Sequence, residues 1–270
     1  MPTANTKAAI GVFDSGLGGL TVVKELTRHL PHENIVYFGD TARVPYGTKS
    51  KEAIIQFSIE NTEALLEHNV KMVVVACNSS SSYAIDRLKK KFSVPILGVI
   101  VPGAKKAAAT SRCKKIGVIA TAATINSGRY TAAVKKFCRN AKVYGKACPL
   151  FVPLVEEGWL DNKITSDIAE TYLKDLKKSG IDTLILGCTH YPLLKTTLQQ
   201  VMGQKVFLVD SAYEVAREVE SILKKNHLLR MSSVKGKTTF IVSDKPQAFE
   251  VIARKFLGYT IKAKVRGHYV

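Results

Sequence analysis

Residues 8–30 read AAIGVFDSGLGGLTVVKELTRHL, and this stretch decides the fold. It opens on a continuous apolar run, residues 8–13, which has the length of a buried strand. After a glycine-rich turn, apolar residues recur at helical spacing over residues 21–30, at Val22, Val23, Leu26 and Leu30. A buried strand followed by an amphipathic helix is the unit of a parallel sheet that is covered on both faces. The stretch therefore predicts the α/β class.

The same alternation continues along the chain. We expect further strands at residues 34–38, 72–76, 95–99, 116–120, 183–186 and 206–209. Helices are expected at residues 51–68, 127–138, 166–178 and 213–225. The C-terminal stretch adds strands near residues 238–242 and 259–265 with a helix near 247–257, and we expect it to pack on the first half.

Two short patterns recur in the second half of the chain. Ile10-Gly11-Val12-Phe13 resembles Ile116-Gly117-Val118-Ile119, and the strand before Cys77 resembles the strand before Cys188. We predict two similar lobes, each a mostly parallel sheet flanked by helices, with the active site in the cleft between them. The first lobe comprises residues 1–97 plus 210–270, and the second comprises residues 98–209.

The net charge of +18, from 40 basic and 22 acidic residues among 270, is the unusual feature of the composition. It suggests a nucleic-acid partner, but half of it lies in residues 224–270, where 11 basic residues accompany two acidic ones. We interpret it as a surface property that attracts an acidic substrate. Five cysteines without a C-x-x-C pair argue against disulfides and zinc. We see no signal peptide or membrane span and expect a reducing cytoplasm.

Cys77 and Cys188 each follow an apolar strand and precede a short polar run that should open a helix. Backbone N–H groups at a helix start favour a thiolate and lower the thiol pKa. Two such thiols facing one cleft suit the inversion of a carbon centre, in which a base removes a proton from one face and an acid supplies one to the other. The alternative for either cysteine alone is a small buried hydrophobe, and we keep that reading for Cys113, Cys138 and Cys148.

Polar residues near the strand ends supply candidate partners. The turn after the first strand lacks the G-x-G-x-x-G pattern of dinucleotide-binding folds, and Asp14 can instead bind an ammonium group or assist Cys77. His190 can exchange a proton with Cys188, and Glu156, which we place in a loop, can orient His190. Candidate substrate contacts are Pro45, Tyr46, Gly47, Asn78, Ser79 and Thr189. The alternative is that Asn78, Ser79 and Thr189 are only helix caps.

Five motifs in one order resemble glutamate racemases of the aspartate/glutamate racemase superfamily. They are DSGLGGL at residues 14–20, FGDTARVPYGTKS at 38–50, ACN at 76–78, GCTHYPL at 187–193 and VDS at 209–211. The resemblance implies a cofactor-independent enzyme that interconverts L- and D-glutamate with Cys77 and Cys188 as its two proton-transfer residues. It also implies assisting roles for Asp14, Asp40, Glu156 and His190. The substrate contacts that it implies are Asp14-Ser15, Tyr46-Gly47, Asn78-Ser79 and Thr189-His190. A homodimer and supply of D-glutamate for peptidoglycan are implied as well. One departure is Ser79, where the family usually has Thr.

Other functions remain to be distinguished. The same site can serve aspartate or another amino acid, because side-chain specificity rests on few contacts. A nucleic-acid-binding protein would need a continuous basic face with exposed aromatic residues. A nucleotide-dependent enzyme is disfavoured by Asp14, whose charge would repel a pyrophosphate, and no lysine lies in a recognisable pyridoxal site. We expect no metal site, no membrane partner and no nucleic acid.

Overall fold

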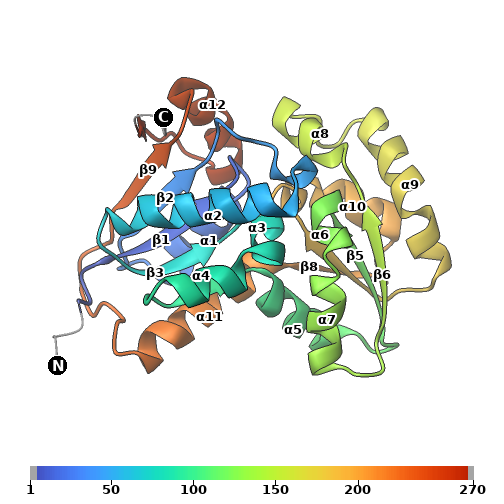
Figure 1. Cartoon of the computed structure of the whole chain (residues 1–270). Helices are drawn as coiled ribbons and strands as arrows, with labels where there is room; N and C mark the ends of the chain where they lie inside the picture. Colours follow the sequence, from blue (N-terminus) through green and yellow to red (C-terminus); the bar gives the residue numbers. More distant parts are fainter. Residues whose placement is uncertain (1–4, 267–270) are drawn as a thin grey trace.

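The computed structural model describes residues 5–266 and consists of two lobes side by side (Figure 1). The first contains a six-stranded sheet in the order β10-β9-β2-β1-β3-β4, and the second a four-stranded sheet in the order β6-β5-β7-β8. Every strand pair in both sheets is parallel. The predicted α/β architecture of two lobes with parallel sheets is confirmed.

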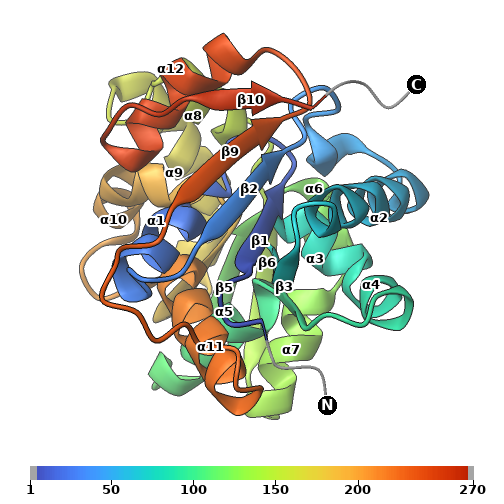
Figure 2. The same cartoon turned by 90° about the vertical axis from the view of Figure 1, so that its left-hand side faces the viewer.

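The strands of the first sheet are β1 (Ala9–Asp14), β2 (Ile35–Gly39), β3 (Val70–Val75), β4 (Ile96–Gly98), β9 (Thr238–Val242) and β10 (Ala263–Val265). Its helices are α1 (Leu20–His29), α2 (Lys51–Leu66), α3 (Asn78–Tyr83), α4 (Ile85–Lys91), α11 (Ser211–Lys225) and α12 (Pro246–Leu257). Figure 2 shows α1 and α11 on one face of this sheet and α2, α3 and α4 on the other. Pairing of β9 with β2 joins the C-terminal segment to this sheet.

The second sheet consists of β5 (Lys115–Ala120), β6 (Lys142–Ala147), β7 (Thr183–Gly187) and β8 (Phe207–Asp210). Its helices are α5 (Ile100–Thr110), α6 (Ala122–Asn126), α7 (Arg129–Phe137), α8 (Phe151–Glu157), α9 (Lys163–Lys178) and α10 (Lys195–Met202). β6 is not predicted from the sequence, because this edge strand is only partly buried and includes Lys142, Gly145 and Lys146. Nor is α5, in which Pro102 lies in the first turn, where a proline costs no helical hydrogen bond.

The chain passes between the lobes after β4 and again after β8, and these two connections touch. A Cβ atom on Gly103 of α5 would lie 2.3 Å from Ser211 Oγ, so only glycine allows this approach. One core cluster contains buried side chains from both sheets, among them Val12, Val74, Ile119 and Leu186. The lobes therefore share part of their hydrophobic core, while the boundaries at residues 97/98 and 209/210 stay a prediction. Among the described residues, no helix has the length and apolar character needed to cross a bilayer.

Candidate active site

The two strand-end cysteines lie buried, one in each lobe. Cys77 follows β3 and is the residue before the first turn of α3, as expected. Cys188 follows β7, but the residues after it form a short 3₁₀ helix, Tyr191–Leu194, before α10 begins. Their exposed fractions are 5% and 6%. Both thiols thus sit at the carboxyl ends of parallel strands, where α/β folds place their ligands.

Asp14, at the end of β1, connects the two lobes. Its Oδ2 accepts a hydrogen bond from the Gly16 amide at 3.0 Å, and its Oδ1 accepts one from Thr189 Oγ1 of the second lobe at 3.4 Å. Burial raises the pKa of Asp14, and the positive charge of His190 and three backbone amides oppose that rise only in part. A buried carboxylate with a raised pKa beside Cys77 is suited to accept a proton from the thiol.

His190 lies between a thiol and a carboxylate. Its Nδ1 is 3.9 Å from Cys188 Sγ, and its Nε2 is 3.0 Å from Glu156 Oε1. Burial alone would lower the pKa of His190, but hydrogen bonds with Cys188 and Glu156 and the negative charges nearby raise it to about 10. His190 is therefore an imidazolium at neutral pH. Glu156 lies near the end of α8 rather than in the expected loop, because residues 151–157 pack an apolar helical face on the core.

The environment of Cys77 differs from the expectation. Its pKa is raised to about 11, because burial and the negative charge of Asp14 outweigh hydrogen bonds from Ser80 and Ser15. The backbone hydrogen bond from Ser80 in the first turn of α3 lowers the thiol pKa, as expected, but its contribution is smaller than the cost of burying a charge. At neutral pH, Cys77 is a thiol that can donate a proton.

The loop after β2 is held by Asp40. This buried carboxylate accepts hydrogen bonds from Arg43 Nε at 2.7 Å, from Ser243 Oγ at 3.0 Å and from the Tyr46 hydroxyl. Tyr46 is itself buried, follows Pro45, and begins the short 3₁₀ helix Tyr46–Thr48. These bonds fix the position of the loop, whereas a direct catalytic role for Asp40 stays a prediction.

Thr121 is a site residue that the sequence analysis missed. It follows β5, and its Oγ1 lies 3.0 Å from Ser79 Oγ of the first lobe. Gly47 packs against the same side chain, because a Cβ there would come within 2.8 Å of Thr121. The internal repeat contained the signal: the resemblance of residues 10–13 to 116–119 places Thr121 where the first lobe has Ser15. A second missed residue is Tyr130, whose hydroxyl donates to Asn78 Oδ1 at 2.7 Å.

The two lobes approach each other closely around these residues. Gly18 is required here, because a Cβ would lie 2.1 Å from Thr189 Oγ1 and 2.6 Å from His190 Nδ1. A cavity of about 10 Å³, lined in part by Asn78, Cys188 and Thr189, has room for one water molecule and not for an amino acid. We call this compact arrangement, in which the turn after β1 touches Thr189 and His190, the closed form.

Comparisons with known proteins identify the family. A family model described as Asp/Glu/Hydantoin racemase matches residues 10–219. The glutamate racemase of Geobacter metallireducens is 50% identical over 250 residues, which are 93% of each chain. That of Neisseria meningitidis serogroup A is 48% identical over 263 residues, which are 97% of each chain.

Solved structures agree with this assignment. A glutamate racemase isoform from Bacillus anthracis superposes with a TM-score of 0.94 at 39% identity, covering 97% of this chain and 98% of that one. The glutamate racemase of Francisella tularensis, solved in complex with D-glutamate, gives 0.90 at 37% identity, with 97% of each chain covered. The chain therefore belongs to the Asp/Glu/hydantoin racemase family, and within it to the glutamate racemases.

Proposed function

We propose that this enzyme interconverts L- and D-glutamate by proton transfer between the substrate and two thiols, without a cofactor. The observation that carries the proposal is the pair of buried cysteines, Cys77 and Cys188, one from each lobe. The lobes meet at the Asp14–Thr189 hydrogen bond. Asp14 is the neighbouring proton acceptor of Cys77, and His190 is the charged neighbour of Cys188. A base and an acid on opposite faces of a carbon are what inversion requires.

One direction of the reaction starts with Cys188 as the thiolate and Cys77 as the thiol. The imidazolium of His190 places a positive charge 3.9 Å from Cys188 Sγ, which is the charge that a thiolate there needs. The Cys188 thiolate removes the α-proton from one enantiomer, and the Cys77 thiol donates its proton to the opposite face. After one turnover Cys188 is a thiol and Cys77 a thiolate, so atoms and charge balance.

The reverse direction uses the mirror arrangement. Cys77 must then lose its proton and Cys188 must gain one before the substrate reacts. Asp14, with a pKa raised by burial, is the adjacent acceptor for Cys77, and the imidazolium of His190 is the adjacent donor for Cys188. Glu156 holds His190 through Nε2 during both directions, which keeps Nδ1 directed at Cys188. The closed form leaves room beside Cys188 for one water molecule and not for bulk solvent, so the carbanionic intermediate forms mainly among fixed hydrogen-bond donors.

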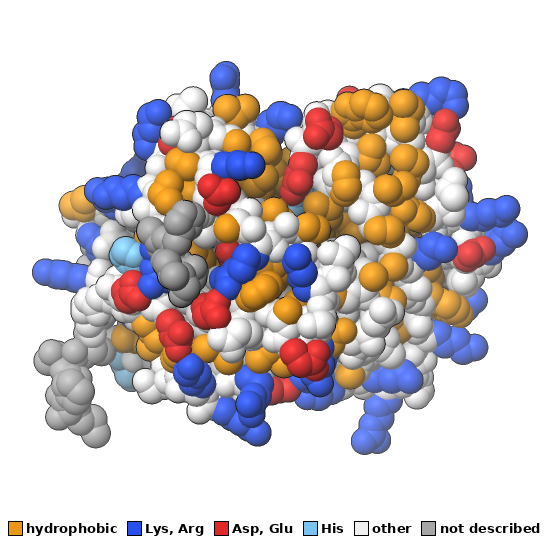
Figure 3. Space-filling model, turned by 45° about the horizontal axis from the view of Figure 1, so that its top comes forward, with side chains coloured by type: hydrophobic (Ala, Val, Ile, Leu, Met, Phe, Trp, Pro, Cys, Tyr) orange, Lys and Arg blue, Asp and Glu red, His pale blue; other side chains and the backbone are white. Residues whose placement is uncertain are grey.

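Substrate binding falls to neutral groups around the thiols. Hydroxyl, amide and backbone N–H groups of Ser15, Tyr46, Gly47, Asn78, Ser79 and Thr189 would hold the two carboxylates, and Asp14 the ammonium. The Ser79 hydroxyl, at the place of the usual Thr, keeps its contact with Thr121. The surplus of basic side chains acts at longer range: on the face drawn in Figure 3 they lie both near the centre and at the edges, interspersed with acidic and apolar ones. This distribution suits attraction of a dianion better than a nucleic-acid surface.

The test is incubation of the purified protein with L-glutamate in D₂O without added cofactor. We expect deuterium at Cα and loss of the circular dichroism signal of the substrate. C77A and C188A should each abolish racemisation. C148A is the control, because Cys148 is also a buried cysteine at the end of a strand. It takes no part in the proposed proton transfers, so C148A should retain activity. Normal racemisation by both C77A and C188A would refute the two-thiol mechanism. Faster turnover of aspartate than of glutamate would refute the choice of substrate.

We further propose that the product D-glutamate feeds peptidoglycan synthesis in the cytoplasm and that the enzyme works as a homodimer. The support is the membership among bacterial glutamate racemases. Rescue of a D-glutamate-requiring bacterial strain tests the first part, and failure of the active gene to rescue would contradict it. Light scattering of the purified protein tests the second, and a monomer mass at active concentrations would contradict it.

A further inference from the structure

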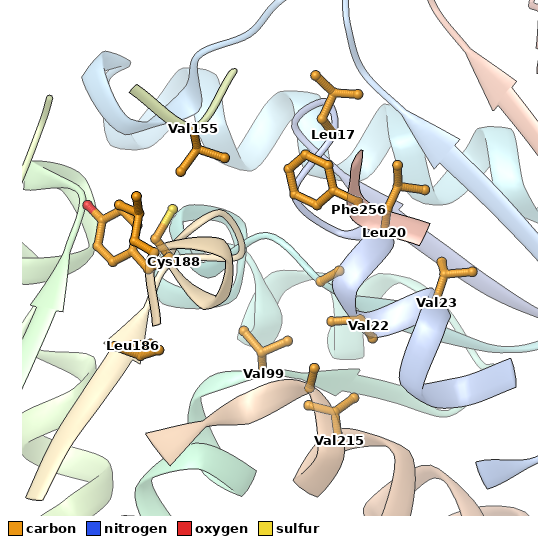
Figure 4. Packing of buried hydrophobic residues seen from close by; sticks show 14 of the residues in the cluster. Leu17, Leu20, Val22, Val23, Val99, Val155, Leu186, Cys188, Val215 and Phe256 are labelled. Carbon is orange, nitrogen blue, oxygen red and sulfur yellow. The ribbon is translucent and has the colours of Figure 1, made fainter. Parts of the chain in front are cut away.

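Helix α12, in the basic C-terminal region that held no predicted site residue, reaches the active site through Phe256. Its ring lies edge-to-face against the imidazole of His190, with ring centroids 5.8 Å apart and planes at 87°. Each of the two side chains is only 3% exposed. In Figure 4 the Phe256 ring stands beside Leu17 and Leu20 of the first lobe and faces the side of Val155 and Cys188 of the second.

The contact crosses from one lobe to the other. Helix α12 is fixed to the first lobe, because Phe249 stacks on Tyr37 of β2 at 6.0 Å and Lys24 Nζ of α1 donates to the Phe256 carbonyl at 3.4 Å. His190 and Glu156 belong to the second lobe. Lys255, the neighbour of Phe256, also approaches the second lobe, since a Cβ on Gly158 would lie 2.7 Å from its Nζ. The Phe256–His190 contact therefore exists in full only when the lobes are closed.

An imidazole that serves two partners has to be held in one orientation. Nδ1 of His190 must point at Cys188 and Nε2 at Glu156, and rotation of the ring would break both contacts. Glu156 has a side chain that is 31% exposed, so water lies within reach of this pair. A large aromatic ring perpendicular to the imidazole blocks its rotation and occupies the space that water would otherwise take.

We propose that Phe256 is a positioning residue, through which the C-terminal helix α12 completes the Cys188 half of the active site when the lobes close. The proposal rests on the proposed function. It assigns the effect to one thiol only, because Phe256 contacts the partner of Cys188, while Cys77 is served by Asp14 and Ser15 from other elements.

The asymmetry has a kinetic signature. L- and D-glutamate have equal free energies, so any variant changes kcat/KM by the same factor in both directions. If only the transfer at Cys188 is slowed, the primary isotope effect with α-deuterated glutamate rises for the enantiomer whose proton Cys188 removes. It falls for the other enantiomer, whose proton Cys77 removes in a step that is no longer limiting. A general loss of folding would not produce this opposite movement.

The experiment compares F256L with F249L. Phe249 lies on the same helix, is 2% exposed and stacks on Tyr37 of β2, whereas Phe256 is the ring that contacts His190, so Phe249 is a matched control for loss of packing. We expect F256L to lower kcat/KM about 2- to 10-fold, the range of a lost aromatic pair. We also expect opposite changes of the two isotope effects and faster alkylation of Cys188 by iodoacetamide, located by peptide mass spectrometry. F249L should change none of these three quantities. If F256L does not fold, F256M, which keeps an apolar chain of similar length, replaces it.

Equal behaviour of F256L and F249L in isotope effects and in Cys188 alkylation would overturn the proposal. The alkylation readout separates the two hypotheses, because it needs no turnover. If the wild-type protein fails to racemise glutamate but F256L alone exposes Cys188, the proposed function fails and the positioning contact stands. If racemisation proceeds and F256L leaves both Cys188 alkylation and the isotope effects unchanged, the positioning role fails and the proposed function stands.

Discussion

Replacing Gly18 with alanine tests whether the contact between the turn after β1 and the Thr189–His190 pair supports catalysis. The added Cβ would lie 2.1 Å from Thr189 Oγ1 and 2.6 Å from His190 Nδ1. Ordinary contact begins at 3.4 Å, so Thr189 Oγ1 has to move by about 1.3 Å and His190 Nδ1 by about 0.8 Å. A misplacement of about 1 Å costs on the order of 100-fold in rate, and overpacking costs about 1–3 kcal/mol of stability.

The assay is circular dichroism of glutamate racemisation together with thermal unfolding. We expect G18A to lower kcat/KM by about 100-fold. Its melting temperature should fall by about 2–4 °C for each kcal/mol of strain. The control is G145A in β6, where the nearest atom to an added Cβ is 3.4 Å away and no site residue is involved. A kcat/KM for G18A equal to that of G145A would refute the reasoning that closure at Gly18 sets the position of His190.

Three further predictions concern charges. First, the pKa of His190 is raised to about 10, so its contribution to stability is complete below its unfolded pKa of about 6.5 and is lost as the pH rises through 10. In urea unfolding, the stability advantage of the wild type over H190N should therefore shrink over this pH range. A constant advantage would contradict this. Second, burial favours a higher pKa for Asp182, but hydrogen bonds from Cys113, Ser111 and Thr183 hold it well below its usual value. The stability difference between wild type and D182N should therefore be complete above the unfolded pKa of about 3.8 and shrink steadily as the pH falls below it, and an undiminished difference at pH 2 would contradict this. Third, K71M leaves the buried Glu33 carboxylate without its ion-pair partner, which should lower the free energy of unfolding by about 3–5 kcal/mol. K71M/E33L, which removes both charges, should unfold at higher denaturant than K71M alone. The reverse order would show that the unpaired charge is not the cause of the destabilisation.

Much of the fold could be predicted from the sequence, because the strands that form the sheet centres are mostly apolar. β1, β3 and β7 are buried along their whole length, and their residues are apolar except for Asp14, Lys71 and Thr183. Partly exposed elements carry a weaker pattern. β6 contains two lysines and a glycine, and α8 is only seven residues long, so neither stands out from a loop. The error over Glu156 follows from the second of these.

The residues of the candidate site also divide into those that the local sequence reveals and those that it does not. Positions directly after buried strands, such as Asp14, Cys77 and Cys188, can be found from local sequence, because the end of an apolar run marks the edge of the sheet. Thr121 also follows a strand and was detectable only through the internal repeat. Tyr130 and Phe256 lie within helices, on faces that look like ordinary core, and no local pattern separates them from residues that merely pack.

The sequence by itself determined the α/β class, the doubled arrangement and the two thiols with their neighbouring polar groups, because each depends on residues close together in the chain. Only the tertiary structure decided which groups surround His190, the partner of Cys188. Glu156 and the ring of Phe256 reach it from segments 34 and 66 residues away in the chain. The tertiary structure also decided the sign of the pKa change at Cys77, since burial is set by how the two lobes close and not by the residues beside the cysteine. Desolvation and charge act through space, and the chain order does not record the distances on which they depend.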